Sequence, residues 1–432
     1  MITQFKLNAK QLNTYDVVVC GGGLAGVAAA VRAADNGAHT LLIESGGELG
    51  GDITKGHVAQ FLDADGKGGF MADIIAFLNA GGHTAPRRGP HYDENGKKLP
   101  GTRIELEYVK YYLDMACRKA GVDVALYSLA AAVETTDGRI TRLLMVTEAG
   151  SYTVEAPIYI DATGNGQIAA DAGCEYEFGH PVTGQPQPAS MAVGIIGLDD
   201  SVKPTDCEED KFALKRRIEE EYGVKVSSNQ VSVGRGSIDG LGGMSVNFQY
   251  NVPHDDIFGL SLATMEGRDE CVDVVNAMNN IPGYEKIRVV STSSHLGIRE
   301  GKRIRGVYRL TTDDIKSGAR FDDGICLVRF GVDVHAISAD DTRKHSKGRE
   351  VVPYHIPYRA LVPLGCSNLL VTGRCISGDF YAHASYRVAG NVVAMGEAAG
   401  FAAAVCAKEH LCPEDLDGKR VHDYMGSLGY EL

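Results

Sequence analysis

A glycine-rich turn near the N-terminus has the residue types and spacing of a dinucleotide-binding site. Gly21, Gly23 and Gly26 fill the pattern G-x-G-x-x-G in CGGGLAG, directly after the apolar run 16–20. In such a turn the first glycine permits the tight bend, the second lets the backbone approach a pyrophosphate, and the third lets a helix pack closely on a strand. Glu44, at the end of the next apolar run, can accept hydrogen bonds from a ribose diol. This acid disfavours the 2′-phosphate of NADP, so these residues leave FAD and NAD as candidates.

The elements around this turn would hold it in position. The valine-rich run 16–20 predicts a buried parallel strand, the alanine-rich segment 25–34 predicts a helix packed on a sheet, and 39–43 predicts a second strand. A glycine triplet alone also occurs in ordinary turns. Strand, turn, helix, strand and acid in this order are much more specific, and they predict an α/β protein that begins with a Rossmann-like unit.

The length and composition are those of a globular protein. The chain has 432 residues, enough for two domains, with 44% hydrophobic residues and a formal net charge of −13. Basic residues are interspersed with acidic ones, which argues against nucleic acid or an anionic membrane as the main partner. No uninterrupted apolar run approaches the ~20 residues of a membrane span, and MITQFKLNAKQLNTYD lacks the apolar core of a signal peptide. We therefore expect a cytoplasmic protein without a membrane partner, and leave a homo-oligomer open.

The cysteines and histidines show no metal-binding or redox spacing. Ten cysteines are scattered without a C-x-x-C pair, and thirteen histidines form no H-E-x-x-H or comparable cluster. These spacings argue against a disulfide-reductase dithiol, an iron–sulfur cluster and a zinc site. We expect mostly buried free thiols and no metal.

The middle of the chain predicts a small antiparallel sheet followed by a second glycine turn. Runs at 130–134, 140–147 and 152–160, separated by TDGR and EAGS, predict a β-meander. The last run leads into DATGNG at 161–166. Residues 176–350 then change character, with polar stretches, β-like segments near 231–251 and a helix at 262–280.

The final third returns to glycine-punctuated αβ patterning. A strand is expected at 368–371, followed by the turn GRCISGD and a long helix at about 388–407. This helix is alanine-rich and apolar nearly all round, so we expect it to lie buried against the dinucleotide domain.

Three separated segments resemble one family. They are GGGLAG with Glu44, DATGNG at 161–166, and NLLVTGRCISGDFYAHASYRVAGNVVAMGEAAG at 368–400. Together they resemble FAD-dependent oxidoreductases of the two-dinucleotide-binding-domain flavoproteins, in particular those related to the flavin-carrying chain of heterodisulfide reductase. ELGGDIT, HLGIREGKRIRGVYRLT and YHIPYRALVPLG fit the same pattern. The resemblance covers most of the chain and is weak between about 180 and 285.

The resemblance implies FAD as the cofactor, bound by a Rossmann-like domain of glutathione-reductase type with a β-meander. FAD-like motifs at both ends imply a discontinuous FAD-binding domain, residues 1–175 and 351–432, with 176–350 inserted as an α+β substrate or cap domain. FAD is long, so its flavin end needs a second set of contacts, including a helix N-terminus for the charge of the reduced ring. The residues that the resemblance assigns to FAD are Gly21, Gly23, Leu24, Ala25, Gly26, Glu44, Ser45, Gly50, Gly51, Thr54, Val133, Ala162, Thr163, Gly164, Gly373, Arg374, Asn391 and Val392.

Hydride exchange with an organic substrate also needs a group that handles a proton and cations that bind a carboxylate or oxyanion. His383 and Arg387 stand four residues apart just before the predicted late helix. Histidine titrates near neutral pH, and arginine stays charged. Arg359 in IPYRALVP suits a bidentate clamp. The other candidates are His57, Arg299, His335 and Tyr386. For each of these side chains, a salt bridge or a satisfied core position is an equally good explanation.

The sequence shows no second glycine fingerprint for NAD(P)H, since GRGSIDG at 234–240 has the wrong spacing. We therefore predict a FAD-dependent oxidoreductase that exchanges hydride between flavin N5 and a small polar organic substrate under the cap, with an unknown electron acceptor or donor. The alternative is a flavin electron-transfer subunit of a heterodisulfide-reductase-like complex, whose iron–sulfur clusters would lie on a partner chain. A third possibility, a non-catalytic FAD-binding or nucleic-acid-modifying scaffold, is disfavoured for RNA by the acidic balance.

Overall fold

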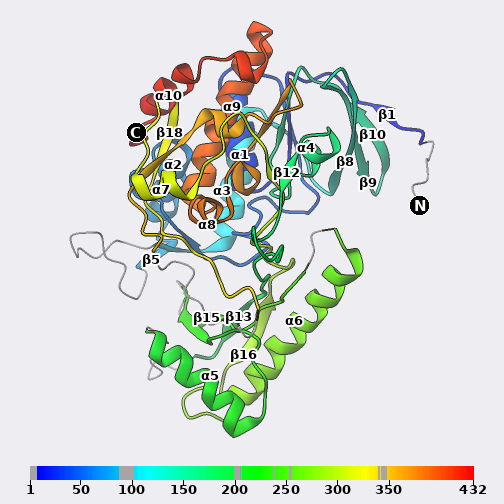
Figure 1. Ribbon diagram of the computed structural model, residues 1–432. Helices are drawn as coiled ribbons and strands as arrows, with labels where there is room; N and C mark the ends of the chain where they lie inside the picture. The colour runs from blue at the N-terminus through cyan, green and yellow to red at the C-terminus, as the bar shows by residue number, and fades with distance from the viewer. Residues whose placement is uncertain are drawn as a thin grey trace.

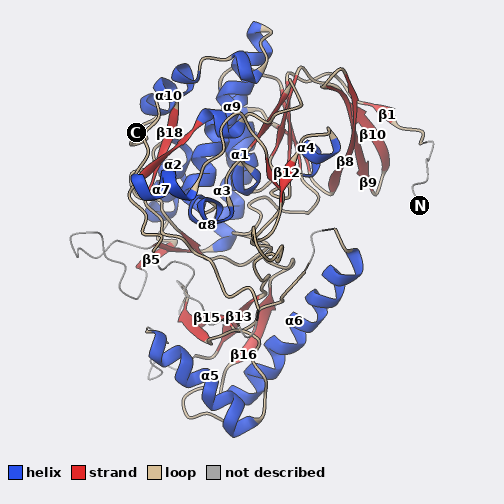
Figure 2. Cartoon of the chain, viewed as in Figure 1, coloured by secondary structure: helices blue, strands red, loops and turns tan. Residues whose placement is uncertain are grey.

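The fold has two bodies of secondary structure, a larger α/β part and a smaller part built on a separate sheet (Figures 1 and 2). The computed structural model describes residues 7–86, 102–198, 205, 207–236, 238, 240–252, 255–338, 341 and 348–432.

A five-stranded parallel sheet forms the centre of the larger part, in the order β20-β11-β2-β3-β7. All neighbouring strands in it are parallel. Four strands are buried along their whole length, as expected for a sheet covered on both faces, and β7 is the exposed edge. β20 comes from the final third of the chain, so the C-terminal segment completes the sheet that the N-terminal segment begins. The strands are β2 (Val17–Cys20), β3 (Thr40–Ile43), β7 (Asp123–Ala125), β11 (Ile158–Asp161) and β20 (Leu369–Val371).

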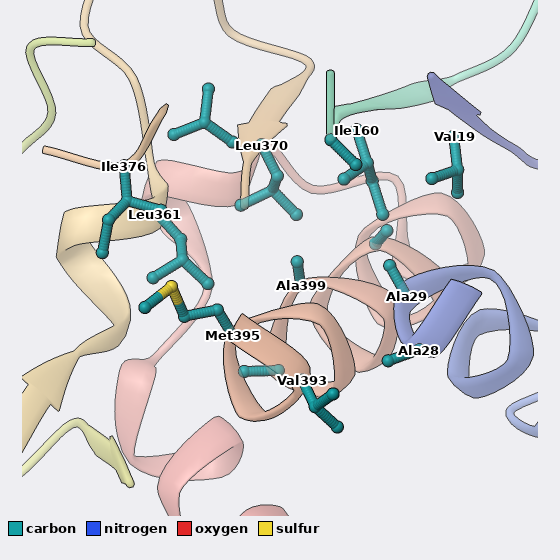
Figure 3. Close-up of a cluster of buried hydrophobic side chains, with 14 of the residues drawn as sticks. Val19, Ala28, Ala29, Ile160, Leu361, Leu370, Ile376, Val393, Met395 and Ala399 are labelled. Carbon is teal, nitrogen blue, oxygen red and sulfur yellow. The ribbon is translucent and has the colours of Figure 1, made fainter. Parts of the chain in front are cut away.

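Helices α1 (Leu24–Asp35) and α9 (Ala389–Glu409) pack closely against each other and against this sheet (Figure 3). A Cβ on Gly396 would lie 2.2 Å from the Ala25 carbonyl oxygen, and one on Gly400 would lie 2.2 Å from that of Ala29. Only glycine permits this approach. Among the described residues, α9 is the one helix long and apolar enough to cross a membrane, but 83% of its apolar window is buried inside the protein. The structure thus agrees with the predicted buried helix.

The predicted meander is present as β8 (Ser128–Thr136), β9 (Arg139–Thr147) and β10 (Gly150–Val154), joined by β1 (Lys10–Gln11). The single strand predicted at 152–160 is in fact two. β10 ends before Pro157, whose missing N–H interrupts a hydrogen-bonded ladder, and β11 then starts in the parallel sheet.

The smaller part has its own core, formed by buried side chains between Ala189 and Leu296. Its sheet has the order β14-β15-β13-β16 and packs with two helices, and Figure 1 shows the group in green, apart from the parallel sheet. The segment GRGSIDG belongs to the antiparallel β14–β15 hairpin, with Ser237 and Asp239 outside the described residues, so its context differs from a strand–turn–helix fingerprint. The elements are β13 (Ala192–Ile196), α5 (Glu208–Tyr222), β14 (Ser232–Arg235), β15 (Leu241–Ser245), α6 (Ile257–Met278) and β16 (Arg288–Thr292).

The chain rejoins the larger core well before residue 350. Ile304, Leu310, Ile315 and Ile325 are buried in the larger core, and β18 (Gly324–Val328) pairs with β19 (Tyr354–Pro357). The second core is therefore shorter than the predicted inserted domain, because the family-like segment after 295 packs with the FAD-like segments. The ten cysteines, all among the described residues, are free thiols. The remaining elements are β4 (Gln60–Phe61), α2 (Gly69–Ala80), β5 (Thr84–Pro86), β6 (Thr102–Ile104), α3 (Leu106–Ala120), α4 (Gln167–Asp171), β12 (Tyr176–Glu177), β17 (Arg303–Ile304), α7 (Thr312–Ser317), η1 (Tyr358–Leu361), η2 (Gly373–Cys375), α8 (Phe380–Tyr386), η3 (Pro413–Asp415) and α10 (Gly418–Ser427).

Candidate functional site

The N-terminal glycine turn is tightly packed at Gly21 and Gly26 and open at Gly23. Gly21 has a φ of +107°, and a Cβ there would lie 2.5 Å from the Ala162 carbonyl oxygen. A Cβ on Gly26 would lie 1.8 Å from the carbonyl oxygen of Gly21. A Cβ on Gly23, in contrast, would have no described atom within 4 Å. This open position at the start of α1 is where the free N–H groups of a helix can approach a pyrophosphate.

A second predicted segment packs onto the turn. Gly23 and Gly50 form a parallel bridge, and the Gly50 N–H donates to the Gly22 carbonyl at 2.8 Å. A Cβ on Gly51 would lie 3.0 Å from the Gly23 Cα. Thr54 is buried at the end of this segment. Two stretches that the sequence predicts to hold one cofactor are therefore in direct contact.

Glu44 is buried beside the turn, and its two carboxylate oxygens interact with four donor groups. Its Oε2 accepts from the Gly22 N–H at 2.8 Å, and its Oε1 accepts from the Gly46 N–H at 2.6 Å and the Ser45 hydroxyl at 3.1 Å. Lys55 Nζ forms an ion pair with the same Oε1. Burial opposes ionisation, but Lys55 and the backbone donors outweigh it and hold the pKa of Glu44 below its ordinary value.

Arg374 joins the turn after β11 to the segment after Gly51. Its Nε donates to the Gly164 carbonyl, its Nη2 to Asn165 Oδ1 and its Nη1 to Asp52 Oδ2, each at 2.9 Å. Asp52 also accepts from His295 Nε2 at 2.9 Å. The Asp52 side chain is about half exposed; partial loss of hydration opposes its ionisation, but Arg374 and His295 lower its pKa to about 2.

Two buried polar side chains near the start of α9 have no well-aligned hydrogen-bond partner among the described residues. Asn391, in the first turn of α9, is fully buried, and neither its amide oxygen nor its amide nitrogen has a hydrogen-bond partner among the described residues. His383 on α8 is equally buried, and its ring nitrogens make no well-aligned hydrogen bond among the described residues, although the Arg374 backbone approaches the ring. Such groups ordinarily find a partner, so both fit a bound ligand that supplies one.

The protonation of His383 differs from the sequence-based expectation. Burial lowers the pKa of His383 well below its ordinary value, and Arg387 and Arg303 lower it further. The imidazole is therefore neutral at pH 7 and does not titrate near neutrality.

Arg387 and Arg299 come together with Asp333 where the chain leaves the second core. Arg387 Nη1 donates to the Arg299 carbonyl at 2.9 Å, and Nη2 donates to the Asp333 carbonyl at 2.8 Å and to Gln187 Oε1 at 3.2 Å. Arg299 Nη1 donates to the Pro188 carbonyl at 2.6 Å. The contacts of Arg387 are those of a structural brace, since two of its three acceptors are backbone carbonyls.

The charged side chains of this group shift one another's pKa values. Burial lowers the pKa of Arg299 to about 10, with a further contribution from Arg387. His335 Nε2 lies 3.6 Å from Asp333 Oδ1, and burial together with Arg299 lowers the pKa of His335. Asp333 is about half exposed; partial loss of hydration opposes its ionisation, but His335, Arg387 and Arg299 hold its pKa well below its ordinary value.

Other predicted residues lie elsewhere. Arg359 forms a bidentate pair with Asp323, at 2.9 and 3.1 Å, so the predicted clamp holds a carboxylate of the chain itself. Its role in binding a substrate stays a prediction. His57 is half-buried with a φ of +56°, and burial and Lys110 lower its pKa. Tyr386 is buried and donates to the Ile376 carbonyl at 3.1 Å.

The remaining predicted FAD residues lie on α1, on β8, in the first turn of α9 and directly after β11. Leu24 and Ala25 begin α1, and a Cβ on Gly373 would lie 3.3 Å from the Ala25 Cβ. Val133 is half-buried on β8, and Val392 is half-buried in the first turn of α9. Thr163 donates its hydroxyl to Asp161 at 2.7 Å, directly after β11.

The family model of FAD-dependent oxidoreductases matches residues 16–425. The chain belongs to this family. The predicted enzyme class and the predicted cofactor, FAD, are therefore confirmed.

Two curated relatives match this FAD-dependent oxidoreductase over part of its length. The digeranylgeranylglycerophospholipid reductase of Methanococcus vannielii is 28% identical over 169 residues, which is 39% of this chain and 43% of the relative. The enzyme of the same name from Methanocaldococcus jannaschii is 30% identical over 169 residues, 38% of this chain and 42% of the relative. The chain thus spans less than half the length of the curated relatives it matches. Both relatives are named as reductases.

The fold of this FAD-dependent oxidoreductase has a counterpart among solved structures. The p-nitrophenol 4-monooxygenase PnpA from Pseudomonas putida DLL-E4 is 11% identical, covers 97% of this chain and 88% of its own, and has a TM-score of 0.50. At this identity the likeness concerns the mixed α/β fold alone.

FAD fits the residues of this FAD-dependent oxidoreductase. The open front of Gly23 leaves room for a pyrophosphate, and the unpartnered groups of Asn391 and His383 are at the start of α9 and on α8. Bound FAD supplies hydride transfer at its flavin ring. Arg374 and Asp52 hold together the segments that would surround it.

Sequence reasoning did not single out Asp52, His295, Asp333 and Gln187. Asp52 and His295 lie within ELGGDIT and HLGIREGKRIRGVYRLT, so their segments were recognised although the residues were not. Asp333 and Gln187 lie outside any recognised motif.

Proposed function

We propose that this FAD-dependent oxidoreductase exchanges a hydride between FAD and a small polar organic substrate. The substrate binds where the second core, residues 189–298, meets the FAD-binding part, and the second core acts as a cap. The observation that carries this proposal is that His295, at the end of the second core, contacts Asp52, and that Arg299, directly after this core, contacts Arg387.

The proposed FAD-binding domain is of glutathione-reductase type with a β-meander. It comprises residues 1–175 and 351–432, and residues 304–332 join its core. The shared sheet of β2, β11 and β20 and the close packing of α1 on α9 support this division.

A polar substrate suits the chemistry of the junction. The Arg374 and Arg387 side chains are only 18% and 10% exposed, so these cations have lost much of their hydration and favour anionic or polar partners. In the proposed site Arg299 binds the substrate, Arg387 positions Arg299 through its carbonyl, and the neutral imidazole of His383 accepts a proton.

The absorption spectrum of the purified protein tests this proposal. We expect flavin bands without the broad absorbance of iron–sulfur clusters, and bleaching of the flavin under anaerobic conditions by a member of a panel of hydroxy acids and sugar derivatives. Reoxidation of the reduced protein by an enoate would support the reverse direction. Iron–sulfur absorbance from a co-purifying chain would instead support the electron-transfer alternative.

Reduction of an isoprenoid double bond is a second candidate. It is favoured by the local similarity to digeranylgeranylglycerophospholipid reductases. Adding a geranylgeranyl lipid in detergent micelles to the chemically reduced protein separates the two candidates. Reoxidation by this lipid alone, without reaction of any polar compound, would replace the polar-substrate proposal.

A further inference from the structure

Arg299 is a guanidinium without an acidic partner of its own. Its side-chain hydrogen bond among the described residues runs to the Pro188 carbonyl, and no described carboxylate lies within 4.0 Å of its nitrogens. The Phe248 ring lies 5.2 Å from its guanidinium carbon and fixes its orientation through a cation–π contact. Since a guanidinium presents five N–H donors, most of those of Arg299 are free for a ligand.

Gln187 gives a second, independent sign of a missing ligand. Its side chain is 4% exposed, and its Oε1 accepts from Arg387 at 3.2 Å. Its Nε2 is buried and has no hydrogen-bond partner among the described residues. An unpaired buried amide N–H costs free energy, and it calls for an acceptor rather than another donor. Gln187 is the chain neighbour of Pro188, so this donor lies on the same segment that holds Arg299.

The pairing of the neighbouring charged side chains also indicates a missing anion at Arg299. Arg374 pairs with Asp52 at 2.9 Å and Arg387 lies 3.9 Å from Asp333, whereas Arg299 has no described carboxylate within 4.0 Å. Nearby Glu300 is already paired with Arg303. An organic carboxylate would supply the counter-charge that Arg299 lacks.

We propose that Arg299 and the Nε2 donor of Gln187 form a carboxylate-binding subsite, so that the substrate is an organic carboxylate. This inference rests on the proposed function, which requires only a small polar substrate. A carboxylate offers two oxygens to the planar guanidinium fork and leaves a lone pair for the amide N–H.

Binding of benzoate to the FAD-loaded protein, measured by isothermal titration calorimetry, tests this subsite. We expect benzoate to bind and neutral benzamide not to bind. Arg299→Gln should weaken benzoate binding at least about tenfold, the usual size for losing a charged hydrogen bond, and Arg299→Lys should restore part of it. Gln187→Leu should weaken it by a smaller factor. Arg305→Gln, which alters an exposed arginine paired with Glu175, is the matched control and should leave it unchanged.

Three outcomes would overturn the inference. They are absence of benzoate binding to the unaltered protein, binding that Arg299→Gln leaves unchanged, and tighter binding of inorganic phosphate than of benzoate. A change in the flavin reduction potential of Arg299→Gln without any loss of benzoate binding would show that the charge serves the flavin instead.

The same measurements separate this inference from the proposed function. If benzoate binds through Arg299 but no organic compound reduces or reoxidises the flavin, the subsite stands and the proposed function fails. If a neutral polar compound reacts with the flavin and Arg299→Gln leaves that reaction unchanged, the proposed function stands and the carboxylate subsite fails.

Discussion

His295 Nε2 lies 2.9 Å from Asp52 Oδ1, although 243 residues separate the two in the chain. Asp52 follows the glycine pair that packs on the N-terminal turn, and His295 stands just after the last strand of the second core. Asp52 also accepts from Arg374. One carboxylate therefore connects the segments predicted to bind FAD to the chain that leaves the second core.

Replacing Asp52 should expose this connection in the acid stability of the protein. The folded-state pKa of Asp52, about 2, lies below the ordinary value of about 3.9 for an unfolded chain. The ionised carboxylate thus stabilises the fold above about pH 4, and this contribution is lost as the pH falls towards 2. Asp52→Asn should melt at a lower temperature than the unaltered protein at pH 7, and this gap should close between about pH 4 and 2.

Because the Asp52 side chain is 45% exposed, we expect a modest difference in melting temperature. Asp423→Asn alters an exposed carboxylate on α10 paired with Lys419 and serves as the control. A gap between Asp52→Asn and the unaltered protein that stays constant down to pH 2 would contradict the ionic role of Asp52.

The contact of α9 with α1 should not tolerate a side chain at Gly396. A Cβ there would lie 2.2 Å from the Ala25 carbonyl oxygen, so the helices must separate. We expect Gly396→Ala to lower the free energy of unfolding by about 1–3 kcal/mol, measured with urea, and to weaken FAD retention because α1 begins at the glycine turn. Gly426→Ala on α10 meets its nearest atom at 3.4 Å and should be neutral or stabilising. Equal stability of the two variants would show that the helices adjust without cost.

The sequence predicted those parts of the fold that local patterns determine. The unit of β2, α1 and β3, the meander and α9 follow from apolar runs, turn residues and alanine-rich composition, and their observed bounds differ from the predicted ones by a few residues. The break between β10 and β11 was missed because an apolar run continues across Pro157.

The charged group at the junction could not be predicted in the same way. Arg387 meets Gln187 at a separation of 200 residues, and no local pattern specifies such a pair. Arg359 illustrates the reverse case, since its motif suggested a clamp but could not reveal that Asp323 fills it. The return of the chain to the larger core after 295 is likewise not marked by a local pattern, because this segment resembles the family without resembling any nucleotide-binding motif.

Glu44 should contribute to FAD affinity. It is buried beside the open turn, and its Oε1 is held by Lys55 in an ion pair that ribose hydroxyls can replace. A hydrogen bond to a charged acceptor contributes roughly 1.5–3 kcal/mol, so Glu44→Ala should weaken FAD binding by about tenfold or more, measured by flavin fluorescence. Glu134→Ala, an exposed acid on β8, is the control. Full flavin occupancy and unchanged affinity in Glu44→Ala would show that Glu44 only holds the backbone of the turn.

His383 should make the protein less stable as the pH falls below neutrality. Its folded-state pKa lies well below 6.5, so the neutral form stabilises the fold above about pH 6.5, and this contribution declines as the pH falls towards the folded-state value. Urea unfolding between pH 7.5 and 5.5 gives the free energy of unfolding at each pH. This free energy should fall more steeply with falling pH in the unaltered protein than in His383→Gln, by up to about 1.4 kcal/mol per pH unit. His410→Asn, at an exposed helix end, should keep the original slope. An unchanged slope in His383→Gln would mean that His383 is not buried as a neutral ring.

Mutation of Arg387 should distinguish a structural role from direct contact with the substrate at the proposed site. Its guanidinium is 10% exposed and donates to the carbonyls of Arg299 and Asp333 and to Gln187 Oε1. Removing it leaves these acceptors unpaired, so Arg387→Ala should lower the free energy of unfolding by at least about 2 kcal/mol, whereas Arg420→Ala, in an exposed pair with Glu409, should cost at most about 1 kcal/mol. Arg387→Lys should recover part of the loss.

Turnover per bound flavin, once a substrate is known, completes the test of Arg387. If Arg387 is a structural brace, Arg387→Ala loses stability, and it loses substrate affinity because Arg299 is displaced. In that case only His383→Ala loses turnover, by about 10²-fold or more, as expected for a positioned proton acceptor. If Arg387→Ala instead unfolds like the unaltered protein and keeps its flavin, yet loses turnover by the same factor, the guanidinium itself contacts the reacting substrate. In that case the carbonyl contacts of Arg387 belong only to the ligand-free state, and the side chain must exchange them for the substrate when it binds.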